Sequence, residues 1–159
     1  MKKTANRFPR KTAAATFAGC TALGIALTGG ATAHAAPSYQ LCTFTYLDPN
    51  NVDAPMRPYS AAWVTPTGEG RLTAELSSFP VYPEPGFNQR FSVTWANLDT
   101  GLSGSVSTEP VHVEGESTTL SIPDITTGAG RITFVFGASN DDGGLVWTNG
   151  DCSAEFTSA

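Results

Sequence analysis

Apolar and polar residues alternate with a period of two in each clearly patterned segment of the chain. In residues 71–76, for example, Leu72, Ala74 and Leu76 alternate with charged or hydroxyl-bearing residues. Successive side chains of a β-strand point to opposite faces, so this pattern predicts a half-buried strand with its apolar side inward. The same alternation predicts strands at residues 42–46, 90–95, 118–122 and 131–136. No window carries a helical apolar stripe longer than two turns.

Clusters of turn-forming residues separate these segments. Gly, Asp, Asn and Thr gather at residues 67–70, 99–101, 127–130, 141–144 and 149–150. Short strands punctuated in this way are typical of antiparallel sandwiches. The sequence therefore predicts an all-β, immunoglobulin-like antiparallel β-sandwich of about seven to nine strands.

The first thirty-five residues follow a different pattern. Five basic residues and no acid occupy residues 1–11, an apolar and small-residue run follows to Gly30, and Ala33-His34-Ala35 comes next. This order is typical of a secretory signal peptide. We predict a signal peptide at residues 1–35, a single domain at residues 36–159, and a secreted, extracellular location.

Two alternatives exist for the leader. Phe17-Ala18-Gly19-Cys20 resembles a lipoprotein box in which Cys20 would be lipidated, but Phe17 replaces the usual aliphatic residue and the apolar run continues to Leu27. A retained membrane anchor would need roughly 20 strongly apolar residues, whereas Thr and Gly interrupt this stretch. Cleavage before Ala36 is the preferred interpretation.

Removal of the leader changes the cysteine count and the charge. Cys20 leaves with it, so Cys42 and Cys152 remain as one predicted disulfide in an oxidising compartment. Residues 36–159 keep four arginines, no lysine and all fourteen acids, a formal charge of −10. Such a surface repels phosphate backbones and anionic headgroups, which argues against nucleic acid and membrane partners.

Two segments resemble a known group of proteins. The segment from Phe91 to Val106 and the segment from Thr127 to Ile132 are similar to the strand-turn-strand cores of small exported immunoglobulin-like β-sandwich proteins of high-GC Gram-positive bacteria. The resemblance implies the fold and export. It implies no catalytic residue.

The sequence offers little for catalysis or metal binding. Residues 36–159 contain one histidine, His112, and no Gly-x-Ser-x-Gly elbow, so no catalytic residue and no cofactor are predicted. His112, Glu114 and Glu116 would share one face of an extended strand and could hold zinc, but a solvated face fits the same pattern. The segments 48–53 and 140–143 are rich in oxygen ligands and raise the question of calcium, although Asx residues also form turns without an ion.

Two connections are longer than usual. Leu47 to Pro58 and Ser77 to Gln89 exceed the common four to six residues, and such loops are often functional. The second combines three prolines with Phe79, Tyr82 and Phe87, which we predict to form a rigid partner-binding loop. The alternative is a stiff crossover whose aromatic side chains cap the core.

The leading hypothesis is an exported, non-enzymatic module that binds a protein or cell-envelope partner through surface loops. A carbohydrate-binding domain, using Trp63 or Trp147, and a protease inhibitor that presents residues 79–87 are the alternatives, while Trp95 is expected in the core. A secreted hydrolase is the weakest alternative, because nothing selects a catalytic pair among the acids.

Overall fold

The computed structural model describes residues 36–82 and 85–159. The predicted signal peptide, with Cys20, lies outside the described residues. Residues 36–159 belong to one compact unit. Among the described residues, no helix is long and apolar enough to span a membrane.

The described part of the chain consists of nine strands and no helix. The strands are β1 (Tyr39–Thr45), β2 (Tyr59–Gly68), β3 (Arg71–Phe79), β4 (Phe87–Asn97), β5 (Ser103–Ser107), β6 (Val111–Val113), β7 (Thr118–Thr126), β8 (Gly130–Asp141) and β9 (Trp147–Ser158). The five strands predicted from alternation are confirmed, and most of them extend beyond the predicted bounds.

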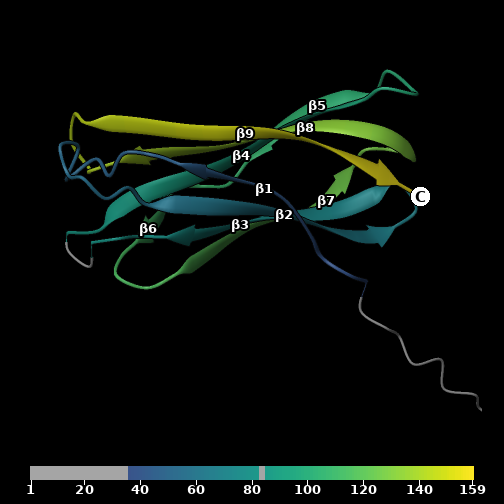
Figure 1. Ribbon diagram of the computed structural model, residues 1–159. Helices are drawn as coiled ribbons and strands as arrows, with labels where there is room; N and C mark the ends of the chain where they lie inside the picture. The colour runs from purple at the N-terminus through teal and green to yellow at the C-terminus, as the bar shows by residue number, and fades with distance from the viewer. Residues whose placement is uncertain (1–35, 83–84) are drawn as a thin grey trace, which may run out of the picture. The chain divides into compact units, whose positions relative to one another are not determined.

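The strands form two antiparallel sheets that pack face to face (Figure 1). Sheet A has the order β1-β2-β3-β7, and sheet B has the order β5-β4-β8-β9, with β6 pairing with β4 beside β5. The pairs β3–β7 and β4–β8 join strands that are distant in sequence, as the B–E and C–F pairs do in immunoglobulin domains. The predicted β-sandwich is confirmed.

The inward residues of both sheets form one core. Leu72 and Leu76 of β3 face Phe91 of β4 and Phe134 and Phe136 of β8, and all five are inaccessible to solvent. Phe134 and Phe136 have ring centroids 5.2 Å apart. Trp95 is 8% exposed and belongs to this core, as predicted. Burial of a large side chain of this kind contributes about 1.5–3 kcal/mol.

The disulfide connects the edge strand of each sheet. Cys42 of β1 and Cys152 of β9 are bonded, with their Cα atoms 6.3 Å apart, so the predicted pairing is confirmed. Gly150 allows β9 to approach β1 closely, because a Cβ there would lie 2.8 Å from Phe44 and 3.0 Å from the Thr45 carbonyl oxygen. The bridge therefore closes one lateral side of the sandwich.

Candidate functional site

Four connections gather at one end of the sandwich, which we call the loop end. They are the connections 46–58, 80–86 (described at residues 80–82 and 85–86), 114–117 and 142–146 (Figure 1). They join β1 to β2, β3 to β4, β6 to β7 and β8 to β9. The loops of an immunoglobulin variable domain that contact antigen gather at one end of the sandwich in the same way.

Hydrogen bonds from asparagine side chains tie these connections together. The Asn50 side chain donates to the carbonyl oxygens of Pro85, at 3.2 Å, and Gly86, at 3.0 Å. The Asn88 side chain donates to the Asp141 carboxylate at 3.1 Å. The Thr148 hydroxyl donates to the Leu47 carbonyl oxygen at 2.5 Å. The Asn50 bonds join the connections 46–58 and 80–86, the Thr148 bond joins 46–58 to β9, and the Asn88 bond joins β4 to the end of β8. Together they preorganise the loop end.

Carboxylates also order the two oxygen-rich segments from within. Asp48 accepts the backbone N–H of Asn50 at 2.9 Å and the side-chain amide of Asn51 at 3.1 Å. Asp142 accepts the backbone N–H groups of Gly144 and Val146, and Asp141 accepts that of Gly143. These are Asx turns. Within the described residues, no three His, Cys, Asp or Glu side chains are grouped as a metal site would require.

The most exposed large apolar residues of the loop end lie in the turn between β8 and β9 and at the first position of β9. Leu145 is 95% exposed and Trp147 is 63% exposed. In the neighbouring connection, Val52 and Met56 are also exposed. Because Asp142 holds the turn, Leu145 projects outward from an ordered backbone. Trp147 was a candidate from the sequence, whereas Leu145 was not.

The structure separates the three residues of the predicted partner-binding loop. Phe87 is 2% exposed and packs edge-on against Tyr46, with ring centroids 5.9 Å apart. It is the first residue of β4 and part of the core, so its assignment as a contact residue is corrected. Phe79 ends β3 and stacks on Tyr59 at 4.7 Å. Tyr82 is half-buried and is the one residue of the three that lies within the connection.

His112 and Glu114 lie beside the same connection. The His112 Nε2 atom is 3.2 Å from a Glu114 carboxylate oxygen, and His112 Nδ1 is 3.4 Å from the Asn88 side-chain oxygen. Glu116 does not join them, because β6 ends at Val113 and the backbone turns at Gly115, where φ is 60°. The zinc hypothesis required all three side chains on one strand face, and this geometry does not provide that face.

A chain of buried polar side chains lies beneath the loop end. Ser60 and Ser78 are 2.8 Å apart across β2 and β3, and Ser78 donates to Gln89 of β4. Gln89 donates to Asn140 of β8 at 2.7 Å. The chain thus crosses from sheet A to sheet B. Each of its members has a partner, as buried polar groups require.

The Tyr46 hydroxyl lies beside this polar chain. Burial raises the pKa of Tyr46, and the nearby groups of Gln89, Ser60 and Ser78 offset that rise only in part. The hydroxyl is near these groups without hydrogen-bond geometry to any of them. Tyr46 is therefore a buried phenol that folding keeps protonated.

We expect the Tyr46→Phe variant to lose less stability than the wild type at alkaline pH. Below the ordinary pKa of 10.0, Tyr46 is protonated in both states and contributes no pH dependence. Above it, the unfolded chain releases the proton while the folded chain retains it, so the free energy of unfolding falls as pH rises. Urea unfolding at pH 9 and about pH 11 should show a smaller decrease for Tyr46→Phe than for the wild type. An equal decrease in both proteins would contradict this assignment.

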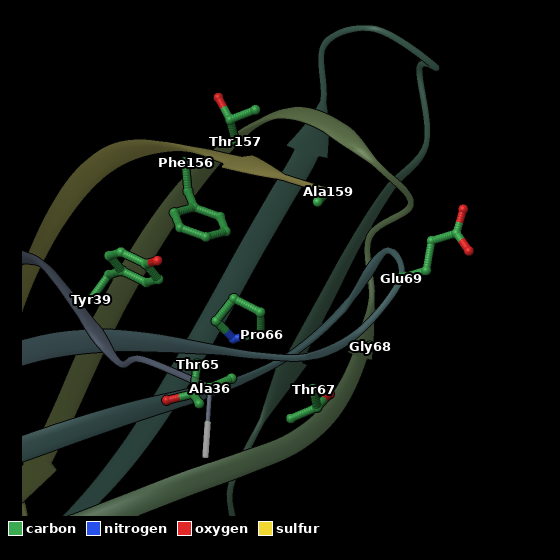
Figure 2. A pocket seen from close by; sticks show the side chains of 10 residues that line it. All are labelled: Ala36, Tyr39, Thr65, Pro66, Thr67, Gly68, Glu69, Phe156, Thr157 and Ala159. Carbon is green, nitrogen blue, oxygen red and sulfur yellow. The ribbon is translucent and has the colours of Figure 1, made fainter. Parts of the chain in front are cut away.

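A groove of about 960 Å³ opens at the other end of the sandwich (Figure 2). The rings of Tyr39 and Phe156 lie on one side of it, with centroids 5.4 Å apart, and Pro66 lies below them, whereas the Glu69 carboxylate points away. Thr65 adds a hydroxyl, which is hydrogen-bonded to Ser38 at 2.7 Å. The lining thus combines aromatic and other apolar side chains with hydroxyl groups, which suits a ligand with both kinds of surface.

Comparisons of the sequence with protein-family models, with curated proteins and with solved structures found no match.

Proposed function

We propose that this protein is an exported, non-enzymatic module that binds a protein partner through the loop end. The observation that supports the proposal most strongly is the 95% exposure of Leu145 on a turn that Asp142 holds in place. A large apolar side chain at a rigid, protruding position gains contact area on binding at little cost in ordering. Trp147, two residues later, belongs to the residue types that dominate binding energy in interfaces.

Charge indicates what kind of surface the partner presents. Asp53, Glu114, Glu116 and Asp142 lie in the connections of the loop end, and their carboxylates are exposed to solvent. An apolar centre with a charged rim is typical of protein interfaces, where complementary charge raises the association rate. The partner that fits is a protein with an apolar pocket bordered by basic residues, in the medium or the cell envelope.

We expect Leu145→Asp and Trp147→Ala to weaken partner binding by about 30-fold each, because a hot-spot residue contributes 2 kcal/mol or more. The partner would first be captured from culture medium and from a cell-envelope extract with immobilised wild-type protein. Binding constants of the variants would then be measured against the captured protein.

Leu102→Asp provides a matched control. Leu102 is 54% exposed and lies in the connection between β4 and β5, at the end opposite the loop end (Figure 1). Leu102→Asp introduces the same charge as Leu145→Asp and replaces the same type of residue. The proposal is wrong if Leu102→Asp and Leu145→Asp weaken binding equally, or if both loop-end variants bind like the wild type.

A further inference from the structure

Aromatic residues are distributed unequally between the outer faces of the two sheets. On sheet A, Tyr59 and Trp63 of β2 and Phe79 of β3 occupy positions that face away from the core. On sheet B, the outward positions of the central strands β4 and β8 hold no aromatic residue. A sheet face that is exposed only to water does not require aromatic residues, and the outer face of sheet B is an example within the same protein. The aromatic residues on the outer face of sheet A therefore indicate a further role.

Tyr59 is supported from one side and open on the other. Phe79 stacks on it from β3, with an interplanar angle of 13°. On the side of β1, Tyr59 borders a cavity of about 510 Å³ that is also lined by Thr43, Thr45 and Arg57. Tyr59 is 45% exposed. At this cavity, an aromatic ring that stacks on Phe79 lies beside two threonine hydroxyl groups and the Arg57 guanidinium.

Trp63 lies between two residues whose side chains are able to form directional hydrogen bonds. Gln40 of β1 is its partner in the β1–β2 pairing, and Glu75 of β3 is its partner in the β2–β3 pairing. An amide offers donors and acceptors, and a carboxylate accepts two hydrogen bonds. Trp63 is half-buried, so the aromatic surface and the polar groups are presented side by side.

These residues form a track along β2, in which the small, buried Ala61 separates Tyr59 from Trp63. Its outward positions are Tyr59, Ala61, Trp63 and Thr65, which span about 20 Å at the rise of an antiparallel strand. The cavity beside Tyr59 lies at one end of the track. The groove of Figure 2, which Thr65 lines, lies at the other end. A track that is open at both ends accommodates an elongated polymer.

We propose that the outer face of sheet A binds a linear neutral polysaccharide along β2. A pyranose ring presents C–H groups that pack on an aromatic face, and its hydroxyl groups both donate and accept hydrogen bonds, as Gln40, Glu75 and Arg57 require. The formal charge of −10 on residues 36–159 disfavours acidic polymers. Apart from Arg57, which lies at the end of the connection 46–58, this site is formed by strands of sheet A, and it does not depend on the function proposed for the loop end.

Affinity electrophoresis of the exported protein tests the proposal. Native gels would contain barley β-glucan, glucomannan, xylan, dextran or soluble starch as neutral polymers, and polygalacturonate as an acidic one. We expect at least one neutral polymer to retard the protein and polygalacturonate not to. Tyr59→Ala and Gln40→Ala should each raise the dissociation constant for that polymer by about tenfold.

Trp147→Ala is the control for this experiment. It removes an exposed aromatic residue at the loop end and should leave retardation unchanged, which separates this site from partner binding. Melting curves confirm that each variant is folded, and Gln40, which is exposed, provides a test that does not alter the core. The proposal is overturned if no neutral polymer retards the wild type, or if both sheet A variants migrate as the wild type does.

Discussion

Replacing Cys42 and Cys152 together by serine is expected to lower the free energy of unfolding by about 4 kcal/mol. The two cysteines are 110 residues apart in sequence, so the bond closes a loop that contains most of the described chain. In the chain-entropy account, a loop of about 100 residues restricts the unfolded state by up to about 4.7 kcal/mol. For a domain of this size, the melting temperature should fall by about 15 °C.

Thermal melting of the oxidised protein, the reduced protein and the double serine variant provides the measurement. The reduced protein and the variant should melt at similar temperatures, well below the oxidised protein. Two thiols that titrate freely in the native protein, or a variant as stable as the wild type, would contradict the expectation.

Phe87→Ala is expected to destabilise the fold by about 3–5 kcal/mol, because it leaves a cavity beside Tyr46 in the core. Tyr82→Ala, in the same stretch of chain, should cost clearly less, because Tyr82 is half-buried and lies outside the strands. Urea unfolding of both variants gives the comparison. A Phe87→Ala variant that unfolds at the same urea concentration as the wild type would contradict the assignment of Phe87 to the core.

The strands that the sequence predicted are those whose inward residues are large. Leu72 and Leu76 in β3, and Phe134 and Phe136 in β8, make the period of two obvious. In β2 the inward positions include Ser60 and Ala62, and in β9 they include Gly150 and Ala154, so the contrast between the faces is weak. At Gly150 the reason is physical, since the close approach of β1 leaves no room for a Cβ.

The site was harder to predict than the fold. Gln89 occupies an inward position of β4 between Phe87 and Phe91 and interrupts the apolar alternation, so β4 was expected to begin after Phe87 rather than at it. Its burial depends on hydrogen bonds to Ser78 and Asn140, which come from other strands. Pairing over such distances cannot be read from one local stretch of sequence.

The exposure of Leu145, like the burial of Gln89, could not be predicted from the local sequence. A single leucine between glycine and valine has the same local pattern whether a hairpin buries it or exposes it. The neighbouring Asp141-Asp142-Gly143-Gly144 predicted a turn, and the structure shows that Asp142 holds it by accepting two backbone N–H groups. The exposure of Leu145 becomes visible only when the position of the β8–β9 hairpin at the end of the sandwich is known.

The bond between β1 and β9 also determines how the domain responds to mechanical force. Tension that enters through the residues before Cys42 and leaves through those after Cys152 passes from one cysteine to the other through a covalent bond. Only residues 36–41 and 153–159 of the described chain can be drawn out, which allows an extension of at most about 45 Å. The hydrogen bonds of the segment inside the bridge are shielded from the load. A domain built in this way resists extension for as long as the disulfide stays oxidised.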